Sequence, residues 1–137
     1  MQLLFDEDYE KLKIDGVTFK EIPEHRFFIF TNYPLPEGLY TVATCDVLVV
    51  IPSNYNQAGN DMLWTNPRLK RSDGQAIPRS EEPGSRHNQR AEEVEYCRWS
   101  RHWSKESPGA WRPGYDDIMS IKRRIDWALK YPDARKS

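Results

Sequence analysis

The spacing of apolar residues is helical at the start of the chain, alternates over its middle and becomes helical again before its end. At the start, Phe5, Tyr9 and Leu12 recur at the spacing of one helix face among acids and lysines. This pattern predicts a short helix from about Asp6 to Lys13. We expect Gly16 to end it, because glycine is common just beyond the last helical residue.

A stronger amphipathic pattern near the end of the chain predicts a second helix. Asp116 and Asp117 would lie at its positive N-terminal end, where carboxylates are favoured, and Pro132 would end it. The basic run Lys122–Arg124 lies largely off the apolar stripe, so we expect it to be solvated. The stripe consists of Ile118, Ile121, Ile125, Ala128 and Leu129.

Four stretches between the helices have the composition of β-strands. The first begins at about Val17 and is closed by Pro23, and the others run from Arg26 to Thr31, from Tyr40 to Ile51 and from Asp61 to Thr65. In the third stretch, alternate residues from Cys45 to Ile51 share an apolar face. Pro52 would stop the hydrogen-bond ladder of that strand. The order of helix, consecutive strands and helix predicts an α+β fold with an antiparallel four-strand meander.

The chain from Asn66 to Arg90 has no periodicity and is rich in charged residues, Pro, Gly, Ser and Gln. We therefore predict a single domain over residues 1–137, with a long irregular loop region over residues 66–110 and a frayed tail over residues 133–137. The segment Arg86–Arg90 (RHNQR) could contact an anion or a partner. Its surroundings nevertheless have the composition of a solvated, flexible loop.

Composition narrows the classes of function. Lys plus Arg number 20 and Asp plus Glu 21, so the near-neutral chain has no global attraction to nucleic acid. No apolar run approaches the roughly 20 residues of a membrane span, and the first residues lack a signal peptide pattern, which favours a soluble, cytoplasmic protein.

Cys45 and Cys97 form neither a disulfide framework nor a metal motif, and mid-strand Cys45 is expected in the core. The acids Asp6–Asp8 lack a neighbouring His or Cys, so we interpret them as helix-dipole partners.

Candidate nucleophiles gather between Cys97 and His102. Cys97 can supply a thiolate, and the neighbouring Arg101 and His102 are of the types that lower a thiol pKa. Ser100 is a second candidate with His102 as its base, because residues two apart on an extended stretch point to the same side. Each also has a structural interpretation: Cys97 as an inert thiol, Ser100 as an ordinary polar residue, and His102 as a hydrogen-bonded residue between aromatics.

A strand that ends in Ile51–Pro52 is followed by Tyr55, a long loop, a Trp-Arg-Pro-Gly turn and an amphipathic helix. This order is similar to the core of a ubiquitin-conjugating enzyme. More narrowly, the chain resembles the prokaryotic ubiquitin-conjugating enzyme family E, of the UBC-like superfamily, over roughly residues 20–131. The segments that carry the resemblance are GLY at Gly38–Tyr40, DVLVVIP at Asp46–Pro52, RWSRHW at Arg98–Trp103 and WRPGYDDI at Trp111–Ile118.

The resemblance implies a UBC-like fold and a place in a bacterial ubiquitin-like modification system of the kind used in antiphage defence. The protein would accept the activated C-terminus of a ubiquitin-like protein and transfer it to an amine. Its implied partners are that ubiquitin-like protein, the activating enzyme and a JAB-type peptidase. Nucleic acid and membranes are not among them, and neither a metal nor an organic cofactor is implied.

Two departures from the pattern of ordinary conjugating enzymes bear on the nucleophile. Their His-Pro-Asn tripeptide is absent, and Asn66–Pro67 is only a partial echo of it. The position eight residues before Trp111, where a cysteine is usual, holds Trp103. Cys97 lies too far upstream unless the segment after Trp103 is an insertion.

Two transfer chemistries and two other classes of function therefore stay open. Cys97 would form a thioester, with Arg98 or Arg101 supporting the anion. Alternatively, Ser100 would form an oxyester while His102 takes its proton, which suits the Ser-His motif of the family. A UBC-like binding module without catalysis is the main alternative. A nucleic-acid-binding domain that uses RHNQR and the last basic helix is a weaker one.

Overall fold

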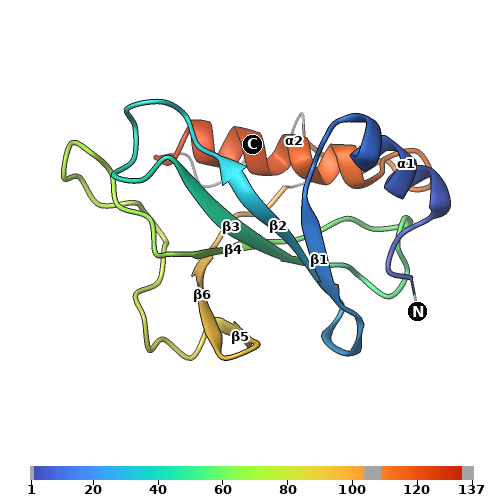
Figure 1. Cartoon of the computed structure of the whole chain (residues 1–137), viewed down its shortest axis with the longest axis horizontal. Helices are drawn as coiled ribbons and strands as arrows, with labels where there is room; N and C mark the ends of the chain where they lie inside the picture. The colour runs from blue at the N-terminus through green and yellow to red at the C-terminus, as the bar shows by residue number, and fades with distance from the viewer. Residues whose placement is uncertain (1, 104–108, 134–137) are drawn as a thin grey trace.

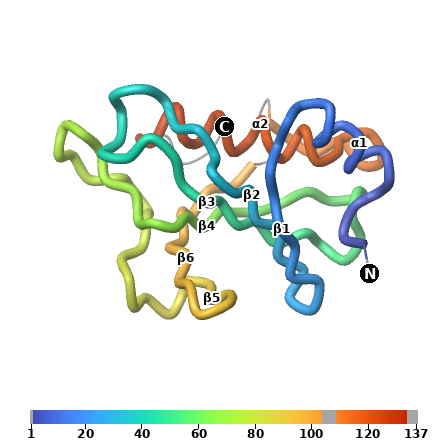
Figure 2. Tube along the Cα trace, in the orientation of Figure 1, coloured from blue at the N-terminus to red at the C-terminus, as the bar shows by residue number. Residues whose placement is uncertain are grey.

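Both helices lie on one face of a curled antiparallel sheet (Figure 1; Figure 2). The computed structural model describes residues 2–103 and 109–133. Over these residues the elements are α1 (Asp6–Ile14), β1 (Phe19–Ile22), the 3-10 turn η1 (Pro23–His25), β2 (Phe27–Pro34), β3 (Thr44–Val50), β4 (Leu63–Asn66), β5 (Gln89–Ala91), β6 (Val94–Trp99) and α2 (Ile118–Lys130). The strand order β1-β2-β3-β4-β6-β5, antiparallel throughout, gives an α+β fold.

The sheet has six strands across the described residues, and the prediction of four was wrong because it missed the β5–β6 hairpin. Both strands lie in the range 66–110, which we predicted as irregular. Both faces of β6 are buried, with Tyr96 and Trp99 in different core clusters, so the alternation that marks a half-exposed strand is absent. The two-residue turn is Glu92–Glu93, with φ of 51° and 68°. Such a turn usually carries Asn-Gly, so the usual hairpin signal was missing as well.

The main core lies between the sheet and the two helices. The apolar face of β3 predicted from alternation, Cys45 to Ile51, is buried in the same cluster as Leu12 of α1 and Ile121 of α2. Burying each such aliphatic side chain stabilises the fold by about 1.5–3 kcal/mol. A second, smaller cluster lies on the opposite face of the sheet and consists of Phe27, Ile29, Leu48, Trp64, Ala91 and Tyr96.

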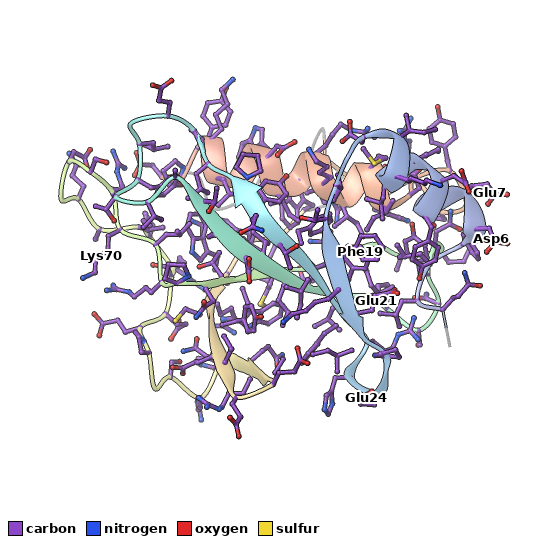
Figure 3. The ribbon with its side chains drawn as sticks, viewed as in Figure 1. Asp6, Glu7, Phe19, Glu21, Glu24 and Lys70 are labelled. Atoms are coloured by element: carbon purple, nitrogen blue, oxygen red, sulfur yellow. The ribbon has the colours of Figure 1, made fainter. Side chains whose placement is uncertain are left out.

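One buried carboxylate joins the two helices. Asp8 accepts a hydrogen bond from the backbone N–H of Phe5 at 2.9 Å, which caps α1, and another from Ile118 at 3.2 Å, at the start of α2. Asp117, predicted at the N-terminal end of this helix, caps α2 and accepts from the N–H of Met119 at 2.9 Å. The acids of the first turn of α1 therefore divide into two kinds, because Asp6 and Glu7 point outward into solvent (Figure 3).

Two further expectations concern the ends of elements and the membrane. α2 ends at Lys130, two residues before Pro132, as the sequence predicted. β3 begins at Thr44 and not at Tyr40, which instead forms an isolated bridge with Arg71. In the part of the chain that the structure describes, no helix has both the length and the apolar character needed to cross a membrane.

Candidate functional site

Pairing of β4 with β6 brings Asp61 next to His102, which lies 41 residues later in the sequence and two residues beyond Ser100. Leu63 pairs with Trp99, and beyond the ladder the N–H of Met62 donates to the carbonyl of Arg101 at 3.1 Å. This pairing places Asp61 and His102 side by side just past the strand ends. Ser100 follows β6 directly, so its side chain lies on the same side of the extended segment as that of His102.

The three side chains form a chain of hydrogen bonds, which we call the triad: Asp61, His102 and Ser100. Asp61 Oδ1 lies 2.8 Å from His102 Nδ1, and His102 Nε2 lies 3.3 Å from Ser100 Oγ. A carboxylate that accepts the Nδ1 proton leaves Nε2 unprotonated and facing the hydroxyl, which is the arrangement of an oriented base and its nucleophile. The Nε2–Oγ distance slightly exceeds the usual range of about 2.6–3.2 Å, as is common without substrate.

The members of the triad differ in exposure. The side chains of His102 and Asp61 are 52% and 67% exposed, whereas Ser100 is 5% exposed. The imidazole is therefore open to a partner molecule, and the serine lies recessed at the end of β6. The predicted pair of Ser100 and His102 is thus brought together, within hydrogen-bond distance.

Asp61 had no predicted role. It was the first residue of an expected strand, 41 positions before His102. Its place in the triad depends on the register of β4 against β6, and β6 was not predicted. No local sequence pattern links the two residues, so the missing signal was the strand pairing itself.

Cys97 lies apart from the triad. It pairs with Thr65 inside the β4–β6 ladder, is 3% exposed, and its Sγ lies 3.7 Å from Asn88 Nδ2. Burial raises the pKa of the Cys97 thiol, and Glu95 adds to the effect. The sequence suggested a lowered pKa, which the structure reverses because this thiol is enclosed. The other thiol, Cys45, is in the core as predicted, and burial raises its pKa to about 12.

The two arginines proposed to support an anion have structural partners. Arg101 is completely buried and donates to the carbonyls of Pro78 and Ser100, both at 3.0 Å, and of Pro132 at 2.9 Å. These bonds tie the end of β6 to the chain beyond α2. Arg98 Nη2 lies 3.7 Å from Glu81 Oε2.

The Trp-Arg-Pro-Gly turn supports the segment that leads to Asp61. Trp111 Nε1 donates to the carbonyl of Asn56 at 2.9 Å, and the N–H of Gly114 donates to the same carbonyl at 3.0 Å. Gly59 lies against the indole so closely that a Cβ there would be 2.1 Å from Trp111 Cε3. The turn therefore packs directly on the residues that precede Asp61.

Arg124 connects the same segment to α2. It was predicted on a solvated face, but it is buried. Its Nη1 donates to the carbonyl of Asn60 at 2.6 Å, its Nη2 donates to that of Gly109 at 2.8 Å, and its Cζ lies 4.8 Å and 5.3 Å from the ring centres of Trp103 and Trp111. Burial lowers the pKa of Arg124 to about 10. Its bonds to Asn60 hold the residue next to Asp61.

A pocket of about 650 Å³ is lined by Trp103, the residue after His102, and by Arg124, which donates to Asn60 next to Asp61. It is lined by Trp103, Gly109, Ala110, Trp111, Arg112, Asp116, Ser120, Arg123, Arg124 and Trp127. Because these residues come from α2 and from the chain between β6 and α2, the pocket opens where the chain turns from the triad into the last helix. Three indoles and three guanidinium groups dominate its walls.

Comparison with known proteins gives one match. The model of a family described as Prokaryotic E2 family E matches residues 4–131. No curated protein and no solved structure matches the chain significantly. Within the described residues, no group of three or more His, Cys, Asp or Glu side chains is placed to hold a metal ion.

Proposed function

Because the chain belongs to prokaryotic E2 family E, we propose that it is a conjugating enzyme that carries a ubiquitin-like protein as an oxyester on Ser100. The family gives a ubiquitin-conjugating-like role, with a ubiquitin-like protein and its activating enzyme as partners. The observation that supports the finer proposal is the Asp61–His102–Ser100 triad. A serine needs a base to become a nucleophile, and the triad supplies an oriented one.

The first transfer forms the oxyester. His102 Nε2 takes the hydroxyl proton as Ser100 Oγ attacks the activated C-terminal carbonyl of the ubiquitin-like protein. The new C–O bond forms, the bond to the leaving group of the activating enzyme breaks, and that group takes the proton from His102. Asp61 accepts the Nδ1–H bond throughout and stabilises the imidazolium while it exists.

The second transfer forms the amide. An acceptor amine attacks the ester carbonyl, the C–N bond forms and the bond to Ser100 Oγ breaks. His102 takes a proton from the amine and returns one to the serine. After both transfers His102 has returned every proton that it took and Ser100 is again a free hydroxyl. The two steps therefore form a complete cycle that needs no cofactor.

A thioester on Cys97 is less consistent with the structure. The thiolate is the reactive form of cysteine, and the enclosed Cys97 thiol has a raised pKa. A transferase using it would have to open the β4–β6 ladder to admit a protein C-terminus.

A second candidate function is a binding module without catalysis. The observation that favours it is the 5% exposure of Ser100, which leaves little of the hydroxyl open to attack. In that case, the triad would only fix the end of β6, and the protein would hold a ubiquitin-like protein or its activating enzyme.

The adduct distinguishes these possibilities. We would incubate the protein with the activating enzyme and ubiquitin-like protein of its own modification system, with ATP, and identify the product by intact-mass and peptide mass spectrometry. We expect an adduct on Ser100 that survives thiol reductant, is released by hydroxylamine and is absent from Ser100→Ala. Cys97→Ala is the matched control and should form it normally. An adduct lost in Cys97→Ala would establish the thioester, and no adduct with a competent activating enzyme would favour the binding module.

A further inference from the structure

The pocket beside the triad, hereafter the tryptophan pocket, has an excess of positive charge. Arg112 is neutralised by Asp116, with Nη2 2.8 Å from Oδ1. Arg123 donates to Ser120 Oγ at 3.1 Å, and Arg124 donates to carbonyls and to an amide oxygen. Among the described residues, no carboxylate lies within ion-pair distance of Arg123 or Arg124.

This excess favours an anionic ligand. The buried Arg124 guanidinium forms no ion pair with the described residues. Burial lowers its pKa to about 10, and the more distant carboxylates of Asp116 and Asp61 offset this effect only in part. An incoming carboxylate would offset that cost, whereas an incoming ammonium group would add a like charge. The exposed Arg123 lies at the same pocket, and beyond its bond to Ser120 its guanidinium has further N–H donors that can pair with a carboxylate.

The pocket also offers apolar contact. The indoles of Trp103, Trp111 and Trp127 line it, and a volume of about 650 Å³ holds several side chains. The ligand therefore combines an acid with apolar groups, which is the chemistry of a short acidic peptide.

The distance to the nucleophile limits which peptide this is. Trp103 follows Ser100 by three residues, so at about 3.3–3.6 Å per residue their Cα atoms are no more than about 10 Å apart. A peptide joined through its C-terminus to Ser100 can therefore reach the Trp103 side of the pocket with the third or fourth residue counted from its end.

We propose that the tryptophan pocket binds an acidic residue at the third or fourth position counted from the C-terminus of the acyl donor, with Arg123 as the residue that selects for the acid. The identification of the peptide as the acyl donor rests on the proposed function. The pocket would then determine which ubiquitin-like protein the enzyme accepts, and a lysine at that position would be excluded by charge.

Binding of synthetic peptides tests this inference separately from catalysis. The protein would be Ser100→Ala, which cannot form the ester. The probes would be fluorescein-labelled hexapeptides ending in glycine, with Glu, Gln or Lys at the third or fourth position from the end. In fluorescence polarisation we expect the Glu peptide to bind about 3- to 10-fold more tightly than the Gln peptide, the gain of one partly exposed charged pair. The Lys peptide should bind more weakly still.

The preference for Glu should disappear in Arg123→Gln, which replaces an exposed side chain and should leave the fold intact. Arg90→Gln, an exposed arginine on the β5–β6 hairpin, is the matched control and should keep the preference. Equal binding of the Glu and Gln peptides would overturn the proposal. So would a preference that persists in Arg123→Gln, or one that inorganic phosphate at equal concentration abolishes, since the site would then be a general anion site. If the preference for Glu holds but no Ser100 adduct forms, the proposed function fails, while the conclusion that the pocket binds an acidic peptide stands.

Discussion

Replacing Asp61 by asparagine tests the triad more sharply than removing the serine. Asparagine has the shape of aspartate, but its amide can donate to His102 Nδ1 where the carboxylate accepts. A donor at Nδ1 selects the tautomer with a proton on Nε2, which then has no lone pair for the Ser100 hydroxyl. The variant keeps the geometry of the site and reverses the direction of its hydrogen bonds.

The expected effect follows from the exposure of the pair. A lost general base costs about 10²–10⁴-fold in rate. The side chains of Asp61 and His102 are 67% and 52% exposed, so water can substitute for part of the 2.8 Å hydrogen bond between them. We therefore expect Asp61→Asn to slow adduct formation by about 10- to 100-fold, at or below the lower limit of that range.

The measurement is the single-turnover rate of adduct formation, followed by mass spectrometry with the loaded activating enzyme in excess. Asp61→Ala should be less impaired than Asp61→Asn, because alanine leaves the imidazole free to choose its tautomer. Asp6→Asn, an exposed acid at the start of α1, is the control for the loss of one surface charge and should react normally (Figure 3). A loss below about twofold in Asp61→Asn, or a larger loss in the alanine variant, would refute the role of Asp61 as the group that fixes the tautomer.

Three further predictions concern the fold that supports the site. Ile121→Ala removes a fully buried side chain of α2 and should lower the free energy of unfolding by about 2–5 kcal/mol in denaturant melts; a loss under about 0.5 kcal/mol would place α2 outside the core. Gly59→Ala places a Cβ 2.1 Å from Trp111 Cε3, so it should destabilise the protein by about 1–3 kcal/mol and reduce the indole protection measured by acrylamide quenching. Unchanged quenching would contradict the close packing. Because folding raises the pKa of Cys97, less thiolate is present at pH 8 in the native chain, and iodoacetamide should modify Cys97 more slowly than in the urea-unfolded chain. Equal rates would mean that the thiol is open.

The elements predicted well are those whose signal is local. The α2 helix carries its whole signal within its own residues, from the Asp117 cap to the isoleucine stripe and the proline beyond, and the structure confirms it. The alternation from Cys45 to Ile51 likewise identifies the face of β3 that meets the helices. In both cases one face is buried and the other is exposed, which is the condition under which periodicity is informative.

The features that were missed depend on the assembled fold. The β5–β6 hairpin turns at Glu92–Glu93, where two glutamates adopt a conformation that sequence patterns assign to Asn and Gly. Asp61 joins the triad only through strand pairing. Helical spacing places Arg124 off the isoleucine stripe and so predicts a surface residue. It is buried because two carbonyls and two indoles enclose it. None of these contacts produces a recognisable pattern in a short stretch of the sequence.

The shared carboxylate of Asp8 makes the two ends of the chain a single cooperative unit. When α1 unwinds, the Ile118 amide loses its acceptor, and the first turn of α2 loses protection in the same event. Ser120, which lines the tryptophan pocket, belongs to that turn. Amide exchange at Ile118 should therefore follow the opening rate of α1 and not that of the rest of α2. A protein that docks on α1 would, by the same linkage, tighten the pocket without touching it.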